Sequence, residues 1–244
     1  MKDKQEVQKT AKLNYSKSTP WSDQDVWHSY TFKSIKQIVE TWLKIYSSKN
    51  ALILNAGSGG TNYQVNRKFI HLDIIEKYIC NYDRYIVGSI ESIDLPNASV
   101  DGVVCVGSVL NYTDAQRSIA ELSRILKPEG FLILEFERSN SAEFLCTKKY
   151  GKYIFRQDYL YNNQRHLLWM YSENHIRQLL KLNNFYICKY KRIHIISSLL
   201  YRLGMSEIIA APFSRYDYAT QLISYPFAHN TILLGIKKTQ EDLK

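Results

Sequence analysis

The tract ALILNAGSGGTNY, residues 51–63, places three glycines and a serine directly after a short apolar run. Consecutive apolar residues without polar alternation are typical of a strand that is buried on both faces of a parallel sheet. Glycine tolerates positive φ and lets a ligand approach the backbone where no Cβ stands in the way. The tract therefore predicts a buried strand that ends in a ligand-binding loop. A βα turn that needs glycine only for packing is the alternative.

The rest of the chain alternates helical patterns with strand patterns. A helix is predicted over residues 21–46, with Ser22 as its N-cap, because apolar residues recur there at spacings of three and four. Further helices are predicted over residues 114–126 and from residue 172 to about residue 184. After the first strand, the predicted strands are residues 68–74, 84–88, 100–107, 131–136, 185–196 and 230–238. This order predicts an α/β fold with a mostly parallel, doubly wound sheet, which binds ligands beyond the carboxyl ends of its strands.

Length and composition favour one globular domain. The chain has 244 residues, of which 45% are hydrophobic, and this suffices for a single buried core. The first eighteen residues lack the apolar run of a signal peptide, and charges within residues 193–213 argue against a membrane span. The four cysteines lie far apart, which argues against a disulfide scaffold and against zinc. We therefore expect a cytoplasmic protein with no metal.

The positive charge is concentrated in one part of the chain. The net charge is +9, and residues 148–192 hold ten basic residues but only two acidic ones. A basic face attracts nucleic acid, anionic lipid or an acidic small substrate. A solvated surface is the alternative, and the sequence does not decide between them.

Asp73 is the second feature of functional interest, because it ends the second predicted strand, eighteen residues after Asn55. An acid in this position commonly accepts hydrogen bonds from the ribose of a nucleoside cofactor. A helix cap is the alternative role, since Asp favours that position. The two features together predict NAD or S-adenosylmethionine (SAM). The dinucleotide fingerprint G-x-G-x-x-G needs a third glycine that the sequence GSGGTNY, residues 57–63, lacks, and this disfavours NAD.

The segment from residue 88 to residue 136 resembles the central half of the class I SAM-dependent methyltransferases. The likeness extends over residues 52–136 and rests on motifs in the family's order: NAGSGG, HLDI, GSIESIDLPNASVDG and RILKPEGFLILEF. It implies a Rossmann-like sheet of seven strands whose last strand, NTILLGIKK, is antiparallel. It also implies one methyltransferase domain over residues 1–244, with a helical lid at 1–49, a cofactor-binding core at 50–137, an insert at 138–171 and a C-terminal half at 172–244. A helical insert is expected at 195–228, and both inserts would cover the active site.

The resemblance also implies roles for individual residues towards SAM and its product S-adenosylhomocysteine. Gly57 and Gly59 would meet the methionine moiety, and Asn55 stands where the family often has an acid. Asp73 would hold the ribose hydroxyls. The residues expected at the adenine ring are Ile74, Ser89 and Ile90, and those expected beneath the sulfonium are Gly107, Ser108 and Val109.

Three further groups of residues are candidates for the reaction itself. Asn111 and Tyr112, just after the fourth strand, are the candidate catalytic residues at the reacting methyl group, with loop packing as the alternative. His166 and His229 are candidate bases. The candidate lid residues are Tyr15, Trp21 and Tyr30, for which a place in the core is the alternative.

We therefore expect a SAM-dependent methyltransferase that acts on a small molecule or a peptide-like metabolite. The basic stretch suggests an RNA methyltransferase as the alternative, but residues 111–114 read NYTD and lack the Asn/Asp-Pro-Pro-aromatic signature of enzymes that methylate base amines. A non-catalytic SAM-binding module is a further alternative, because fold does not dictate chemistry. The apolar face within residues 195–228 fits a cover over the pocket, or contact with a membrane surface or a partner. The acceptor atom and the oligomeric state cannot be read from the sequence.

Overall fold

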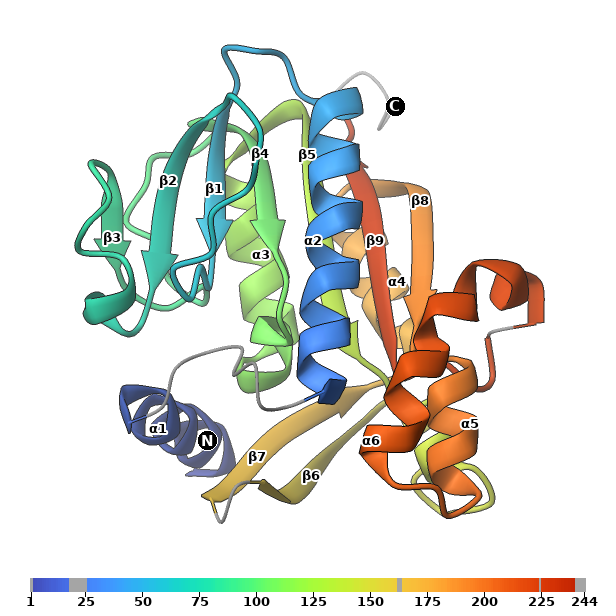
Figure 1. The fold of residues 1–244 in the computed structure, drawn as a ribbon. Helices are drawn as coiled ribbons and strands as arrows, with labels where there is room; N and C mark the ends of the chain where they lie inside the picture. The colour runs from blue at the N-terminus through green and yellow to red at the C-terminus, as the bar shows by residue number, and fades with distance from the viewer. Residues whose placement is uncertain (1, 18–25, 162–163, 224, 240–244) are drawn as a thin grey trace.

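A seven-stranded sheet forms the centre of the computed structural model, which describes residues 2–17, 26–161, 164–223 and 225–239 (Figure 1). The order across the sheet is β3-β2-β1-β4-β5-β9-β8. Strands β1 to β5 pair in parallel, and β9 runs antiparallel to both β5 and β8. The strands are β1 (Leu52–Ala56), β2 (Lys68–Asp73), β3 (Tyr85–Val87), β4 (Val100–Cys105), β5 (Leu126–Glu137), β8 (Phe185–Ile193) and β9 (Asn230–Lys237).

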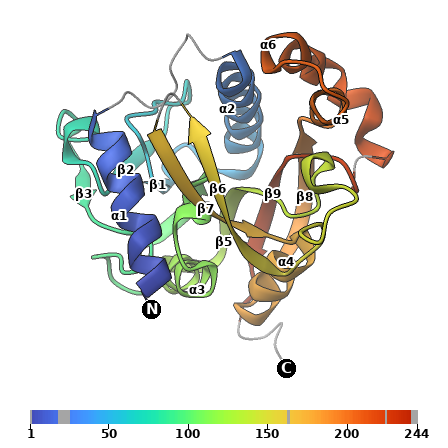
Figure 2. The same cartoon turned by 90° about the horizontal axis from the view of Figure 1, so that it is seen from below.

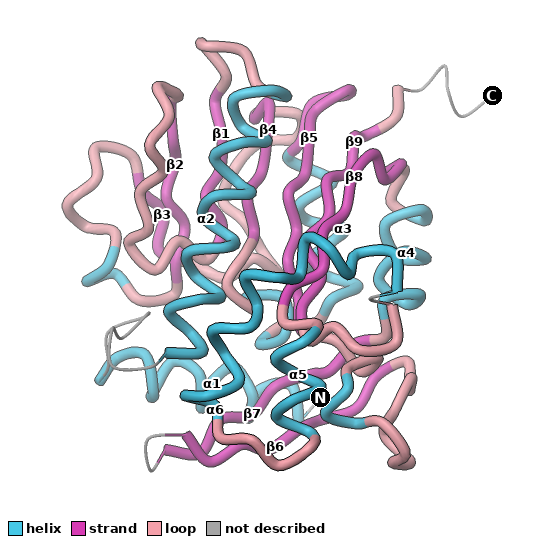
Figure 3. Tube along the Cα trace, turned by 45° about the vertical axis from the view of Figure 1, so that its right-hand side comes forward, coloured by secondary structure: helices cyan, strands magenta, loops and turns pink. Residues whose placement is uncertain are grey.

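Helices cover both faces of this sheet. Helix α2 (Val26–Tyr46) packs on one face, while α3 (Ala115–Ile125) and α4 (Glu173–Leu182) pack on the other (Figures 1 and 3). Successive residues of a strand point to opposite faces. Ile53 accordingly belongs to the α2 side of the core and Leu54 to the α3 side. Side chains on both faces of the inner strands are therefore buried and mostly apolar, and this explains the apolar runs in the sequence.

Additional elements gather at the carboxyl ends of the parallel strands. Seen from below, a two-stranded hairpin crosses under the sheet, with α1 on one side of it and α5 and α6 on the other (Figure 2). These elements are α1 (Lys2–Lys17), β6 (Ile154–Tyr161), β7 (Gln164–Tyr171), α5 (Ile196–Arg202) and α6 (Glu207–Ala210). Four 3₁₀ helices complete the described elements: η1 (Glu76–Tyr78), η2 (Val109–Tyr112), η3 (Ala142–Phe144) and the longer η4 (Ala211–Ile223).

The predicted fold class is confirmed, including the antiparallel last strand and the helices on both faces. Two elements had not been predicted individually: α1, and the β6–β7 hairpin within the expected insert at 138–171. Within the expected helical insert at 195–228 the structure has three helical segments, α5, α6 and η4. The predicted N-cap Ser22 lies outside the described residues.

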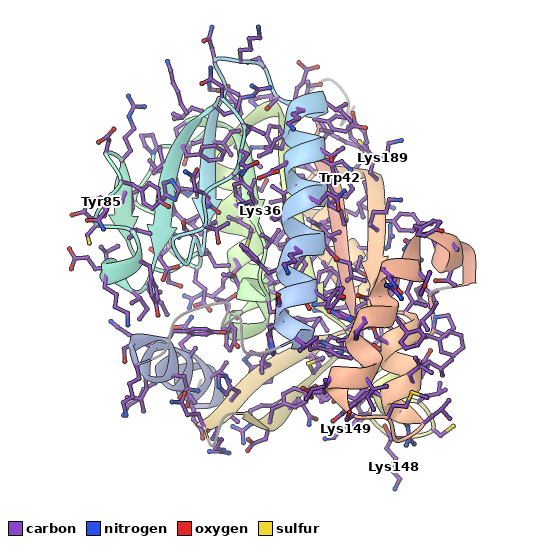
Figure 4. All side chains as sticks on the ribbon, viewed as in Figure 1. Lys36, Trp42, Tyr85, Lys148, Lys149 and Lys189 are labelled. Carbon is purple, nitrogen blue, oxygen red and sulfur yellow. The ribbon has the colours of Figure 1, made fainter. Side chains whose placement is uncertain are left out.

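The basic stretch at residues 148–192 does not form one continuous surface. Figure 4 places Lys148 and Lys149 at one end of the molecule, whereas Lys189 lies on β8 towards the other end. Arg177 and Arg192 are both paired with Glu173. Part of the charge therefore serves to hold elements together. Among the described helices, none combines the length and apolar character needed to cross a membrane.

Candidate functional site

The glycine loop follows β1 directly and is held by the strand next to it. The amides of Gly57 and Ser58 both donate to the carbonyl of Leu72 at the end of β2, at 2.8 and 2.9 Å. Gly57 and Gly59 have positive φ, of 71° and 52°. Such angles are costly for residues with a Cβ, so the loop needs glycine at these positions.

Asn55 stabilises the loop from within. Its side chain is 2% exposed, and Nδ2 donates to the Thr61 carbonyl at 3.0 Å and to Ser58 Oγ at 3.2 Å. The amide thus ties the end of β1 to the far side of the glycine loop. A carboxylate in the same place could not donate these bonds, which gives a structural reason for the amide.

Asp73 joins the loop to the second strand. Its Oδ2 accepts a hydrogen bond from the Gly59 amide at 2.7 Å, and its Oδ1 accepts one from the Ile75 amide at 2.9 Å. The bond from the Ile75 amide is a capping bond, which is the alternative role that the sequence allows for Asp73. The side chain is 8% exposed, and burial raises the pKa of this carboxyl group while the backbone bonds oppose the rise. After these two bonds the carboxylate still has unused lone pairs for a ligand.

Gly57 also faces the segment after β4. A Cβ at this position would lie 2.3 Å from Cγ2 of Val109, well inside contact distance. We expect Gly57→Ala to lower the free energy of unfolding by about 1–3 kcal/mol for overpacking and by about 1–2 kcal/mol more for the left-handed backbone. Urea unfolding with and without Val109→Ala separates the two parts, because the second substitution removes the two Cγ atoms nearest to the new Cβ and leaves Val109 Cβ 3.0 Å away. Gly88→Ala is the matched control, since its Cβ would meet nothing within 4 Å. Equal losses at Gly57 and Gly88 would contradict this account of the loop.

A cavity of about 1240 Å³ opens at this loop, beyond the carboxyl ends of the strands. Most of the sequence-predicted residues line it, although they come from seven separate segments of the chain. They are Tyr15, Asn55, Gly57, Gly59, Asp73, Ile74, Ser89, Ile90, Gly107, Ser108, Val109, Tyr112, His166 and His229. The described parts of α1, α2, the hairpin, α5 and α6 all contribute further wall residues.

Two predicted site residues do not reach the cavity. Asn111 is fully buried, and its side chain bonds only to backbone: to the Glu137 amide and carbonyl and to the Trp169 carbonyl, at 2.7–3.0 Å. It therefore joins β5 to β7, and it is not among the residues that line the cavity, which argues against the expected catalytic role. Tyr30 lies on α2 but does not line the cavity. Trp27 and Thr31 of the same helix do line it, so Tyr30 lies on another side of the helix. Trp21 lies outside the described residues.

Tyr15, a candidate lid residue, lines the cavity beside Tyr112. Its hydroxyl is 3.0 Å from that of Tyr112, and the two rings meet edge to face with centroids 5.7 Å apart. The hydroxyl of Tyr78 donates to the Tyr15 carbonyl, and Lys77 Nζ donates to the Ser16 carbonyl at 2.6 Å. These bonds dock the end of α1 over the segment that follows β2.

A cluster of two half-buried acids and a half-buried histidine forms another part of the cavity wall. Glu137 ends β5, Glu143 lies on η3, and His229 precedes β9; all three line the cavity. His229 lies between the carboxylates, with Nε2 3.5 Å from Glu137 Oε2 and Nδ1 3.5 Å from Glu143 Oε2. Tyr159 donates its hydroxyl to Glu143 at 2.8 Å, and Ser108 donates its hydroxyl to Glu137 at 2.7 Å. We call Glu137, Glu143 and His229 the acid–histidine cluster.

The sequence singled out His229 as a candidate base, but it gave no reason to connect this residue with Glu137 or Glu143. One signal was present in the sequence. Glu135 and Glu137 lie two residues apart at the end of the apolar run FLILEFE, and carboxylates in a buried strand are rare unless they are paired. Glu135 is fully buried and accepts from the amides of Gly107 and Ser108, at 2.8 and 2.7 Å, and from Asn230 Nδ2 at 2.6 Å. It fixes the loop after β4. Among the described residues, no group of three or more His, Cys, Asp or Glu is arranged to hold a metal ion.

Comparisons with known proteins agree with this geometry. A family model described as a methyltransferase domain matches residues 54–134. The ubiquinone/menaquinone biosynthesis C-methyltransferases UbiE of Marinomonas sp. (strain MWYL1) and Caulobacter vibrioides are 30% identical over 74 residues and 36% identical over 73 residues. Each match covers 30% of this chain, and it spans only 29% and 28% of the two relatives.

The likeness in structure extends further than the likeness in sequence. The 1,6-didemethyltoxoflavin-N1-methyltransferase of Burkholderia thailandensis has a TM-score of 0.61 with this chain at 15% identity. The superposition covers 96% of this chain and 90% of the other. Nearly the whole chain therefore shares this fold, including segments outside residues 54–134.

Proposed function

Because the chain belongs to the class I, Rossmann-like SAM-dependent methyltransferases, we propose that it transfers a methyl group from SAM to a small molecule or a peptide-like metabolite. One observation carries the proposal: a single cavity extends from the glycine loop and Asp73 to the acid–histidine cluster. It brings a nucleoside-binding arrangement together with groups that can receive a proton.

The residues at the loop fit an adenosyl cofactor. Asp73 has acceptor capacity left for the two ribose hydroxyls, and the glycine backbone leaves room for the amino-acid end. Ile74 and Ile90 are apolar wall residues suited to the adenine ring. When bound, SAM supplies a methyl group on a positively charged sulfur, while the chain supplies orientation and electrostatics.

The size of the cavity supports a small acceptor beside the cofactor. Ligand pockets usually measure about 300–1,000 Å³, and the cavity, at about 1240 Å³, exceeds that range. The walls beyond the glycine loop include aromatic rings on separate elements, Trp27, Tyr112 and Tyr201. The solved relative holds a small heterocycle together with S-adenosylhomocysteine, as its name states. This combination favours a small acceptor over RNA.

Rigid loops are the chain's own contribution to the reaction. The buried Glu135 carboxylate holds the amides of Gly107 and Ser108, so the segment expected beneath the sulfonium is fixed before any ligand binds. Holding two reactants in a productive geometry contributes about 7–11 kcal/mol in favourable cases. We assign Glu135 a positioning role for this reason.

Titration calorimetry with SAM, S-adenosylhomocysteine and NADH tests the cofactor. We expect heat of binding for the two adenosyl compounds and none for NADH. Incubating the protein with cell extract and SAM labelled in its methyl group then tests the reaction. Label in the low-molecular-weight fraction would support the proposal, and label in RNA would replace it with the RNA methyltransferase alternative. Binding of SAM without any transfer would favour a non-catalytic module, and binding of NADH alone would refute the cofactor assignment.

A further inference from the structure

The acid–histidine cluster carries more negative than positive charge. It contains two carboxylates, on Glu137 and Glu143, and one imidazole, on His229. Burial alone would lower the pKa of His229, but the carboxylates of Glu137, Glu143 and Glu135 raise it above its usual value. Other titratable groups also act on these residues: Lys149 lowers the pKa of Glu143 and His28 lowers the pKa of Glu137, while His166 interacts with Glu137 and His194 with His229. With the imidazole protonated, one negative charge remains without a partner in the cluster.

The carboxylates also keep hydrogen-bond acceptor capacity. An ionised carboxylate offers about four lone-pair sites. Glu137 uses one for Ser108 Oγ, and Glu143 receives the Tyr159 hydroxyl at 2.8 and 3.1 Å. The contacts to His229 are 3.5 Å, longer than the ~2.9 Å of a good N–H···O bond. The cluster is therefore built to receive a hydrogen-bond donor from the cavity.

The cluster also adjoins the segment expected beneath the sulfonium. The Ser108 amide donates a hydrogen bond to Glu135, and the Ser108 hydroxyl donates one to Glu137. A single residue therefore links the two acids of β5. Its backbone is left-handed, with φ 57°, which turns the chain back towards the sheet at this point. The same cavity wall thus continues from Gly107 and Ser108 to the cluster.

We propose that Glu137, Glu143 and His229 form the acceptor subsite: they bind the O–H or N–H group that is methylated, and they take up its proton. The inference rests on the proposed function and adds the class of acceptor, a neutral or cationic hydrogen-bond donor rather than a carboxylate. An anionic acceptor would meet the surplus negative charge of the cluster and would be repelled.

Methylation of an O–H or N–H group releases a proton, and the cluster takes up this proton. The acceptor's O–H or N–H bond breaks, and its proton passes to the cluster. The electron pair of the acceptor atom forms the new bond to the methyl carbon. The bond between that carbon and the sulfur breaks, and its electrons stay on sulfur. A buried group that accepts the proton makes an acceptor with a high pKa reactive at neutral pH.

NMR with three probe compounds tests the subsite in the presence of S-adenosylhomocysteine. Phenol donates a hydrogen bond, anisole has the same ring without the donor, and benzoate is anionic. In protein labelled at histidine Cε1, we expect phenol to shift the His229 signal and to bind about tenfold or more tightly than anisole, the difference made by one bond to a charged group. Benzoate should not bind. Equal affinities for phenol and anisole, or tight binding of benzoate, would overturn the subsite.

Substitutions then test whether the preference for phenol over anisole depends on the residues of the acid–histidine cluster. We expect His229→Gln and, as a second variant outside the strands, Glu143→Gln to reduce phenol binding to the level of anisole, while calorimetry shows unchanged affinity for S-adenosylhomocysteine. His175→Gln is the matched control, since this histidine does not line the cavity and packs against Tyr171. Phenol affinity that survives both cluster variants would refute the subsite. If wild-type protein failed to bind S-adenosylhomocysteine, the proposed function itself would fail, which is a separate result.

Discussion

Asp73→Ala is expected to weaken SAM binding by about 10- to 150-fold, the loss of hydrogen bonds to a charged group worth about 1.5–3 kcal/mol. The carboxylate has two tasks in this structure. It lines the cavity where the ribose is proposed to bind, and it accepts the amide of Gly59, which holds the glycine loop in place. Removing it takes away both the ligand contact and the support of the loop. Titration calorimetry with SAM and S-adenosylhomocysteine measures the change.

Two further variants test whether the loss depends on the carboxylate at this position. Asp73→Asn keeps the size of the side chain but places an NH₂ group where a carboxylate oxygen now receives an amide, so we expect a similar loss. Asp83→Ala removes an exposed acid between the second and third strands and should leave the affinity unchanged. Thermal unfolding of each variant shows whether the fold persists. A folded Asp73→Ala protein with wild-type affinity for SAM would rule out the ribose assignment.

Local sequence sufficed for the glycine loop and for the sheet, because the information there is local. Residues 51–60 predict both the strand and the turn, since an apolar run and a cluster of glycines are adjacent in the chain. Asp73 could be added because parallel neighbouring strands bring their carboxyl ends to one edge. The structure pairs Ala56 at the end of β1 with Leu72, one residue before Asp73.

The acid–histidine cluster could not be predicted in the same way. Glu137 and Glu143 flank a turn, but His229 comes from a distant part of the chain, and β9 brings it back by pairing with β5. No spacing rule connects such residues, because the sheet order decides their proximity. The surroundings of Asn111 could not be predicted for a related reason. Its position after β4 suggested the active site, yet backbone groups of β5 and β7 satisfy its side chain.

The β6–β7 hairpin was not predicted, although the sequence contains a pattern typical of a hairpin. Residues 154–161 and 164–171 are rich in aromatic and aliphatic residues, and Asn162 and Asn163 lie between them. Two residues with a preference for turns between two such runs favour a hairpin. The basic residues of this segment indicated a charged surface rather than a hairpin. In the structure Arg165 is paired with Asp158 across the hairpin and with Glu6 of α1.

The largest effect on stability is expected from Glu173→Gln, which should lower the free energy of unfolding by about 3–5 kcal/mol. Glu173 is 1% exposed, and its carboxylate contacts Arg192 at 2.9 Å, Arg177 at 2.8 Å and Arg138 at 3.5 Å, and accepts from Thr231 Oγ1 at 3.1 Å. Arg138 is fully buried. A neutral amide would leave buried guanidinium groups without their counter-charge, in the region where α4, β8 and β9 meet.

The pH dependence of this loss follows from the pKa of Glu173. Burial alone would raise that pKa, but Arg192 and Arg138 lower it to about 2. A carboxylate whose pKa is lower in the folded state stabilises the fold above its unfolded pKa, about 4.3, and loses this contribution as the pH falls towards the folded value. The difference between wild type and Glu173→Gln should therefore be constant from neutral pH down to about pH 5 and should shrink below it. Urea unfolding at a series of pH values measures this difference.

Glu6→Gln is the matched control, because Glu6 also pairs with two arginines but lies on the surface. Its contacts to Arg156 and Arg165 measure 2.9 and 3.3 Å, and its side chain is 42% exposed. Solvent screens such pairs, so the expected loss is below about 1 kcal/mol. Desolvation, rather than the number of ion pairs, then decides the cost of each substitution. Comparable losses at Glu6 and Glu173, or a Glu173→Gln loss that does not change with pH, would show that the buried guanidinium groups do not depend on this carboxylate.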